Sequence, residues 1–335
     1  MRFATIASVE LIQTPRKHKE ESFASAVRTG LSKPQKTLPC RFFYDKTGSE
    51  LFEQICDLPE YYPTRTEGGM LESDALQIIE TAMQDGNELT LVEFGSGSSV
   101  KTRILLDATL SKQPYLQYSP IDISADFLLE SAQALQQDYP NLSIRAVASE
   151  YQDALPHLPS YPLQSRLFLF LGSSIGNFDL FGAVAFLEQV SQHMTATDRL
   201  LIGFDRVKDI SVLEAAYNDA AGVTAKFNKN LLTRINRELG GNFVLDQFDH
   251  HAPFTRAYNR IEMRLVSRCA QSVYIEALDQ TVDFAKGEFI HTEDSHKHTD
   301  QSIAALAEAT GLEIEATWMD TRSWYSLVMF SKSNV

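Results

Sequence analysis

Residues 92–102 read VEFGSGSSVKT, and this stretch decides which fold the sequence predicts. Its apolar part ends at Phe94, a turn follows at Gly95 and Gly97, and a helix is expected from Ser98 onward. Glycine accepts positive φ and lets a ligand approach the backbone, whereas serine can cap the first free amides of a helix. A strand, a glycine turn and a helix in this order are typical of the first unit of an open α/β sheet, where nucleotide-like cofactors bind.

The residues around and beyond this turn predict alternating strands and helices. The predicted strands cover residues 89–95, 115–124, 142–150, 166–174 and 199–204, and the helices between them cover 98–110, 125–139 and 179–193. Such alternation implies a parallel sheet with right-handed crossovers. A helix at 301–310 and two closing strands at 312–320 and 325–332 predict a terminal hairpin. A parallel core that ends in this way is the layout of methyltransferases that use S-adenosylmethionine (SAM).

The remaining sequence predicts a second architecture. Residues 211–239 are expected to form two helices, and residues 243–293 to form antiparallel strands inserted into the α/β pattern. A further helix is predicted at 20–31 after a polar start, and an aromatic-rich segment follows at 38–71. A short helix in that segment is expected to begin at Gly48.

The composition is that of an acidic globular protein. The 335 residues are 44% hydrophobic and 22% charged, which excludes a disordered chain. The net charge of −14 argues against nucleic-acid and anionic-membrane partners, because both require clustered Lys and Arg. Cys40, Cys56 and Cys269 are odd in number and far apart, as expected for thiols in a reducing compartment. The N-terminus lacks the apolar core of a signal peptide, and no apolar run is long enough to cross a bilayer, so a cytoplasmic protein is predicted.

Acidic residues near the ends of the predicted strands narrow the choice of cofactor. Asp122 ends the second strand, where a carboxylate can bind both hydroxyls of a ribose. The gap from Gly95 exceeds the roughly 20 residues of a dinucleotide fingerprint, and the glycines do not form GxGxxG. A cofactor with a ribose and without a pyrophosphate fits best. Glu150 and Tyr151 follow the third strand, where an adenine would lie, although such a pair is more often ordinary surface.

Two further groups of residues have both a structural and a functional interpretation. The motif GSSIGN at 172–177 follows the most apolar strand, where a transferase would bring substrate to cofactor. Asn177 offers a donor and an acceptor there, but a turn asparagine is the simpler interpretation. Four tyrosines would by default be packing residues, but clustered tyrosines can also line an amine pocket through cation–π contacts. They are Tyr44, Tyr61, Tyr62 and Tyr217.

The segment HTEDSHKH at 291–298 is a possible metal cluster. Its spacing is not HExxH, and a solvated strand end is the default interpretation. On a strand, Glu293 and Ser295 share one face and could bind an imidazole or amide edge by paired hydrogen bonds. His250 and His251 have no predicted partner and are expected at the surface.

Ten motifs occur in order along the chain and together carry a resemblance to a known family. They are FYD, GSELF, LPEYYPTRTE, GSGSS-KTR, PIDIS, FLGSSIGN, AYNDAAGVTAKFN, NRELG, RIEMRL and TE-S-K. The chain resembles the histidine Nα-methyltransferases of ergothioneine biosynthesis, which make hercynine, from about residue 20 to the C-terminus. Ten motifs in one order are far more specific than any one of them.

The resemblance implies a class I SAM-dependent methyltransferase fold. Such a fold has a Rossmann-like, mostly parallel sheet with a C-terminal antiparallel hairpin, here joined to an α+β substrate-binding domain. The SAM-binding domain would comprise residues 66–207 and 298–335, and the substrate-binding domain residues 1–65 and 208–297. SAM would be converted to S-adenosylhomocysteine, and no metal is implied.

The resemblance also implies roles for individual residues. The residues expected to hold SAM are Gly95, Lys101, Asp122, Glu150 and Tyr151. The family often has Asp-Phe where Glu150-Tyr151 stands, so the acid and the aromatic ring are kept. The residues expected to bind the amino acid are Tyr61, Gly172, Asn177, Tyr217, Met263, Glu293 and Ser295. Among these, Tyr61, Asn177 and Tyr217 would bind the amine and carboxylate end, Glu293 and Ser295 the imidazole, and Met263 would line the side-chain pocket. Tyr44 would lie beside the attacking amine, with Tyr44 and Asn177 as the catalytic pair.

The implied reaction is stepwise trimethylation of the α-amine of L-histidine, with the mono- and dimethyl forms as intermediates. A monomer without nucleic-acid or membrane partners is expected. The alternatives are an N-methyltransferase of another amino acid such as tryptophan, and a non-catalytic amino-acid-binding relative. A dehydrogenase and a metal hydrolase are less consistent with the motifs.

Overall fold

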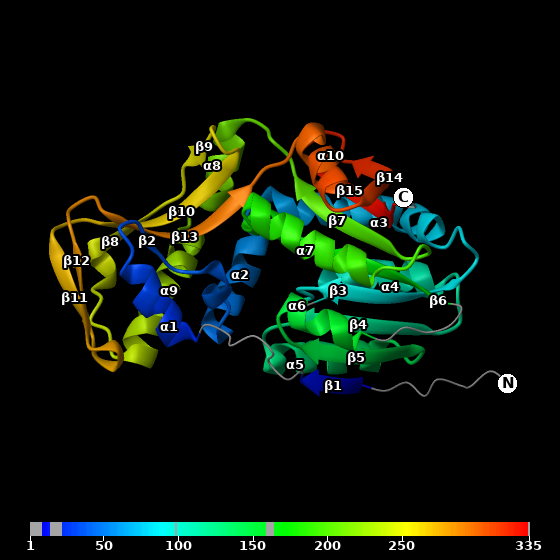
Figure 1. Cartoon of the computed structure of the whole chain (residues 1–335), viewed down its shortest axis with the longest axis horizontal. Helices are drawn as coiled ribbons and strands as arrows, with labels where there is room; N and C mark the ends of the chain where they lie inside the picture. Colours follow the sequence, from blue (N-terminus) through cyan, green and yellow to red (C-terminus); the bar gives the residue numbers. More distant parts are fainter. Residues whose placement is uncertain (1–8, 14–21, 98, 159–163, 334–335) are drawn as a thin grey trace. The chain divides into compact units, whose positions relative to one another are not determined.

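A computed structural model describes residues 9–13, 22–97, 99–158 and 164–333 (Figure 1). The chain divides into two compact units. Unit 1 comprises Met1–His18, Thr66–Arg206 and His298–Val335, and unit 2 comprises Lys19–Arg65 and Val207–Lys297. None of the helices in the described part of the chain combines the length and the apolar character needed to cross a membrane.

Unit 1 is built on one eight-stranded sheet. Across the sheet the strands are β1 (Val9–Gln13), β5 (Leu142–Ala148), β4 (Leu116–Asp122), β3 (Glu88–Phe94), β6 (Gln164–Phe170), β7 (Arg199–Asp205), β15 (Tyr325–Lys332) and β14 (Leu312–Met319). The pairs from β1 to β7 are parallel, whereas β15 is antiparallel to both β7 and β14. This confirms the predicted mostly parallel sheet with a C-terminal antiparallel hairpin.

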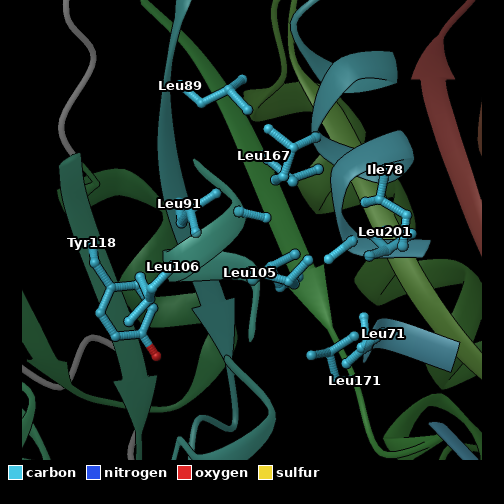
Figure 2. Close-up of a cluster of buried hydrophobic side chains, with 14 of the residues drawn as sticks. Leu71, Ile78, Leu89, Leu91, Leu105, Leu106, Tyr118, Leu167, Leu171 and Leu201 are labelled. Atoms are coloured by element: carbon cyan, nitrogen blue, oxygen red, sulfur yellow. The ribbon is translucent and has the colours of Figure 1, made fainter. Parts of the chain in front are cut away.

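Helices cover both faces of this sheet, so unit 1 has three layers. They are α3 (Tyr62–Ala82, whose first residues belong to unit 2), α4 (Val100–Leu110), α5 (Ala125–Asp138), α6 (Tyr151–Ala154), α7 (Leu180–His193) and α10 (Asp300–Ala309), with the 3-10 turns η2 (Leu155–His157) and η3 (Ser174–Asn177). Apolar residues of α3 and α4 pack on one face, where Leu91 and Leu167 contribute from the strands (Figure 2). Apolar residues of α5 belong to the same cluster. Residues of α6, α7 and α10 pack on the other face around Val92 and Phe168. Successive strand residues point to opposite faces, which explains why nearly every residue of the central strands β6 and β7 is buried.

The strand β1 lies in a different unit from the one that the sequence predicts for residues 1–65. Residues 1–65 are predicted as one part of the substrate-binding domain, but β1 pairs in parallel with β5 of unit 1. Leu11 and Val9 contact the apolar cluster of unit 1, so burial of these side chains holds the strand there. Ser98, the expected helix start, lies outside the described residues, and α4 begins at Val100.

Unit 2 combines helices with a small sheet that is antiparallel except for the parallel pair β2 (Lys36–Thr37) and β13 (Phe289–His296). Its helices and 3-10 turns are α1 (Phe23–Leu31), η1 (Cys40–Phe43), α2 (Lys46–Cys56), α8 (Ile210–Tyr217), α9 (Val223–Leu239), η4 (Leu245–Gln247) and η5 (Glu276–Leu278). Its strands are β2 (Lys36–Thr37), β8 (Phe248–His251), β9 (Phe254–Thr255), β10 (Arg260–Ser267), β11 (Gln271–Ile275), β12 (Gln280–Phe284) and β13 (Phe289–His296). The strands β2, β13, β10 and β8 are neighbours in this order, and β11 pairs with β12 alone. Helix α2 begins two residues before the expected Gly48, because the Asp45 side chain caps it by accepting from the Gly48 amide at 2.8 Å.

Candidate functional site

The carboxyl ends of four neighbouring strands of unit 1 bring the predicted cofactor residues to one edge of the sheet. Gly95 directly follows β3, and Asp122 ends β4 beside it. Glu150 follows β5, and Gly172 follows β6, which pairs with β3 on its other side. After β3 the chain forms β4 on one side of that strand, and it later forms β6 on the other side. Ligands of open α/β sheets bind where the strand order reverses in this way.

Gly95 has the backbone geometry that a close ligand approach requires. Its φ is +70°, and a Cβ atom at this position would lie 2.7 Å from the hydroxyl of Tyr151. The Tyr151 ring packs edge-on against Phe94 and Phe170, with centroid distances of 5.7 and 5.6 Å. The structure therefore brings two of the predicted SAM residues, Gly95 and Tyr151, into the same place.

Asp122 presents its carboxylate to the same turn. It accepts hydrogen bonds from the backbone nitrogens of Ser124 at 3.0 Å and Gly97 at 3.3 Å. Desolvation by the surrounding protein raises the pKa of Asp122, and these backbone hydrogen bonds oppose the rise. A carboxylate with two fixed acceptor oxygens at this point suits the hydroxyls of a ribose.

Lys101 has a partner that no sequence pattern predicts. Its ammonium group forms an ion pair with the buried carboxylate of Glu67 on α3. The same carboxylate accepts the Tyr325 hydroxyl at 2.8 Å and the Gly172 amide at 2.9 Å. Glu67 thus joins Lys101 and Gly172. It is the last residue of the motif LPEYYPTRTE, and no pattern in the sequence assigned a role to Glu67 itself.

A second buried acid, Glu93, lies one residue before the end of β3. It accepts hydrogen bonds from Tyr118 and, at 2.8 Å, from Thr102. Burial raises its pKa to about 7, while these two hydrogen bonds and Lys101 oppose the rise. The sequence gives little sign that Glu93 is a buried functional candidate. A single acid in a strand before a glycine turn looks like one of the solvent-facing polar residues that alternate with apolar ones.

The loop after β6 is held in a fixed conformation. Gly172 and Ser173 both adopt positive φ, at 76° and 56°. The Ser173 hydroxyl accepts the Asp205 amide at 2.8 Å, which ties the loop to β7. Asn177 ends η3 in this loop, and so Gly172 and Asn177 belong to unit 1, whereas the other predicted substrate residues belong to unit 2.

These residues fit SAM. The Asp122 carboxylate has acceptor oxygens suited to ribose hydroxyls, and Tyr151 has an aromatic ring suited to an adenine. Gly95 leaves room that a Cβ atom would fill. Lys101 carries a positive charge suited to the carboxylate of the cofactor's amino-acid end, although Glu67 shares that charge here.

Unit 2 brings the predicted substrate tyrosines together in one aromatic cluster. The Tyr61 ring lies edge-on to Tyr217 at 6.1 Å and to Phe52 at 6.3 Å. Tyr44 contacts the same Phe52 ring at 5.6 Å and Phe227 of α9 at 5.7 Å. Burial raises the pKa of Tyr61 well above its ordinary value, and negative charge on Tyr217, Cys56, Tyr44 and Glu293 would raise it further. Tyr61 therefore keeps its proton and has an O–H group available to a ligand as a donor.

The paired strands β10 and β13 position the remaining predicted substrate residues. Met263 lies directly opposite Glu293, and Ile261 lies opposite Ser295. Directly opposite residues share a face, so Met263, Glu293 and Ser295 line one side of this pair. The Tyr217 hydroxyl lies 2.7 Å from Ser295 Oγ, which joins this face to the aromatic cluster.

Glu293 is buried in this group, with 8% of its surface exposed. Burial raises its pKa to about 8, Lys297 opposes the rise, and Asp294 adds to it. A carboxyl group in this state offers both an O–H donor and a C=O acceptor. That combination matches the edge of an imidazole or an amide.

The histidines of the segment 291–298 do not form a metal centre with one another. His291 contacts Asp294 at 2.8 Å, and His298 belongs to unit 1, where its ring packs edge-on to Phe204. Within residues 9–13, 22–97, 99–158 and 164–333, no group of three or more His, Cys, Asp and Glu side chains is arranged to hold a metal ion.

His250 differs from the prediction that it lies at the surface. Its ring contacts the side-chain amide of Asn228 at 2.9 Å and the backbone carbonyl of Tyr217 at 2.7 Å. Burial lowers the pKa of His250. His250 thus holds the end of α8 that carries Tyr217, a role that depends on packing between distant segments and leaves no sequence pattern.

Comparison with known proteins gives a consistent result. The family described as "Histidine-specific methyltransferase, SAM-dependent" matches residues 23–332. The histidine N-alpha-methyltransferase of Mycolicibacterium smegmatis is 42% identical over 307 residues, which cover 92% of this chain and 94% of that protein. The protein of the same name from Mycobacterium tuberculosis is 42% identical over 91% of this chain and 94% of its own length. The L-tryptophan methyltransferase of Psilocybe serbica is 28% identical over 92% of this chain and 93% of its own length. The chain therefore belongs to the family of histidine-specific, SAM-dependent methyltransferases.

Proposed function

We propose that this protein transfers three methyl groups from SAM to the α-amine of L-histidine and so makes hercynine for ergothioneine biosynthesis. The observation that carries the proposal is the shared face of β10 and β13, where Glu293 and Ser295 lie beside Met263. This face offers paired polar groups for an imidazole and an apolar thioether for the rest of the side chain. The mycobacterial relatives support the same substrate.

The two units have separate tasks in this proposal. Unit 1 binds SAM through Gly95, Asp122 and Tyr151, with Glu150 and Lys101 beside them. Unit 2 binds histidine, with Tyr61 and Tyr217 at the amine and carboxylate end. Gly172 and Asn177 of unit 1 are the remaining residues that we propose contact the amino acid. When bound, SAM supplies an electrophilic methyl group on its sulfonium, so the protein's main task is to aim a neutral amine at it.

The amine must lose a proton before each transfer, because free α-amines are mostly protonated at neutral pH. Tyr61 cannot accept this proton, because burial raises its pKa and its hydroxyl is already protonated. We assign Tyr44 and Asn177 to orienting the amine while its proton leaves through solvent. The tyrosine cluster also suits the product, because aromatic rings stabilise a quaternary ammonium by roughly 0.5 to 2 kcal/mol each.

Product analysis tests this proposal. The purified protein is incubated with SAM and L-histidine, and the amino acid is examined by mass spectrometry over time. Histidine should gain one, two and then three methyl groups, and a parallel incubation with L-tryptophan should show far slower transfer. Transfer to tryptophan in preference to histidine would favour the second substrate. Histidine binding without any methyl gain would favour a non-catalytic binding protein.

The proposal has three further parts. The protein is a monomer, it is located in the cytoplasm, and residues 66–207 and 298–335 bind SAM. Sedimentation of the purified protein tests the first of them. Calorimetric titration with S-adenosylhomocysteine tests the cofactor assignment, because Asp122→Ala should abolish the binding while Glu293→Ala should leave it intact.

A further inference from the structure

Lys297 is a buried cation beside the predicted imidazole-binding residues. Only 3% of its surface is exposed. Its Nζ atom lies 2.7 Å from Ser295 Oγ and 3.2 Å from the Tyr217 hydroxyl, and 4.8 Å from the centre of the Tyr217 ring. Its backbone nitrogen donates to the Asn259 carbonyl at 2.7 Å, which fixes the chain directly after β13. Lys297 is the last residue of the motif TE-S-K, and neither the sequence nor the proposed reaction assigns it a task.

The ammonium group of Lys297 sets the direction of two of the hydrogen bonds among these three side chains. An ammonium group only donates, so Ser295 and Tyr217 both accept from Lys297. The two hydroxyl oxygens lie 2.7 Å apart, so one of their two O–H groups spans that distance. Either oxygen can donate across this distance, and we assign the donor role to Tyr217 because a phenol is more acidic than a serine hydroxyl. Ser295 then accepts twice, and its own O–H is left to donate elsewhere.

We propose that Lys297 is a positioning residue that fixes the Ser295 hydroxyl as a donor, so that the site selects a neutral imidazole through its unprotonated ring nitrogen. The inference rests on the proposed function. A neutral imidazole has one nitrogen that accepts and one that donates. Ser295 donates to the first, and Glu293, which shares its strand face, accepts from the second.

The arrangement discriminates against other rings. An imidazolium has no acceptor nitrogen and would place a positive charge near the Lys297 ammonium. A phenyl ring has no acceptor either, and an indole offers only a donor. Each of these would leave the buried Ser295 O–H unpaired, which is costly because the hydroxyl has already lost its contact with water.

A double-mutant cycle tests the inference. Lys297→Met, Ser295→Ala and the double variant are compared with the wild type for kcat and KM of histidine at saturating SAM. Each single variant should raise KM on the order of 10- to 100-fold, as expected when a buried polar group loses its hydrogen-bond partner. The double variant should be no worse than Ser295→Ala alone, because Lys297 acts through Ser295. Lys286→Met, at an exposed lysine of the same unit, is the matched control and should leave KM unchanged.

The outcomes separate this inference from the proposed function. If the wild type methylates histidine but the KM increases of Lys297→Met and Ser295→Ala multiply in the double variant, the role of Lys297 is overturned. The proposed function then stands. An unchanged KM in Lys297→Met has the same consequence. A wild type that does not methylate histidine overturns the proposed function and the inference with it. If Lys297→Met does not fold, as judged by thermal unfolding, the same cycle is measured with Lys297→Gln, which keeps an uncharged donor.

Discussion

Both carboxylate oxygens of Glu67 lie 2.9 Å from the backbone nitrogen of Gly172. Glu67 is completely buried and also holds Lys101 and the Tyr325 hydroxyl. A single carboxylate thus connects α3, α4, the loop after β6 and the C-terminal hairpin. Lys101, which is proposed to bind SAM, and Gly172, which is proposed to bind the amino acid, are both held by this carboxylate.

Replacing Glu67 should weaken both stability and cofactor binding. Glu67→Gln leaves Lys101 without its counter-charge, and breaking a buried ion pair costs roughly 3 kcal/mol. The loss is measured by denaturant unfolding and by titration with S-adenosylhomocysteine. Glu72→Gln is the control on the same helix, because Glu72 is exposed and its replacement should stay within about 0.5 kcal/mol. Equal effects of the two variants would contradict the role given to Glu67.

Gly95 and Gly97 should respond differently to alanine. Both have positive φ, 70° and 51°, so each substitution costs about 1–2 kcal/mol in backbone conformation. Only at Gly95 does the added Cβ meet another group, the Tyr151 hydroxyl at 2.7 Å, whereas nothing lies within 4 Å at Gly97. Gly95→Ala should therefore weaken binding of S-adenosylhomocysteine more than Gly97→Ala. Adding Tyr151→Phe to Gly95→Ala should recover part of the loss, and no recovery would argue against the close contact.

Glu293 should make the stability of the ligand-free protein fall as pH rises. Burial raises its pKa from 4.5 to about 8, so the folded protein keeps a proton that the unfolded chain releases above about pH 4.5. The stabilisation is complete below that value and is lost as pH approaches 8, at most by about 1.4 kcal/mol for each pH unit. Glu293→Gln removes this titration. The unfolding free energy of the wild type minus that of Glu293→Gln should fall steadily from pH 5 to 8, and a constant difference would refute the assignment.

The Tyr61 hydroxyl should matter for substrate binding more than for folding. Tyr61→Phe keeps the ring contacts with Tyr217 and Phe52 and removes only the donor. We expect KM for histidine to rise about tenfold, the effect of one lost hydrogen bond of roughly 1 kcal/mol or slightly more. Tyr258→Phe, at an exposed tyrosine of the same unit, should change neither KM nor the melting temperature. A loss of stability without a change in KM would make Tyr61 a packing residue.

The parts of the molecule that follow local rules were predictable from the sequence. The strand, glycine turn and helix around Gly95 have a fixed order of residue types, and the alternation beyond them predicted the sheet and its hairpin. The spacing of Glu293 and Ser295 placed both on one face because strand side chains alternate. Family resemblance supplied the substrate, which no local pattern could indicate.

The parts that depend on contacts between distant segments were not predictable in this way. Glu67 and Lys101 are 34 residues apart in sequence and meet only once α3 and α4 pack. His250 reaches Tyr217 across 33 residues. The strand β1 is five residues long and contains a glutamate, so its apolar side chains were too few to reveal a strand.

The position of β1 has a practical consequence for handling the protein. Without it, β5 would become an outer strand with a free row of backbone amides and carbonyls. Such a row is a template for pairing with another chain. A shortened version that starts after Gln13 would keep every residue proposed to touch a ligand, yet it would carry a surface prone to self-association. Expression plans that trim the amino terminus should therefore retain Val9–Gln13.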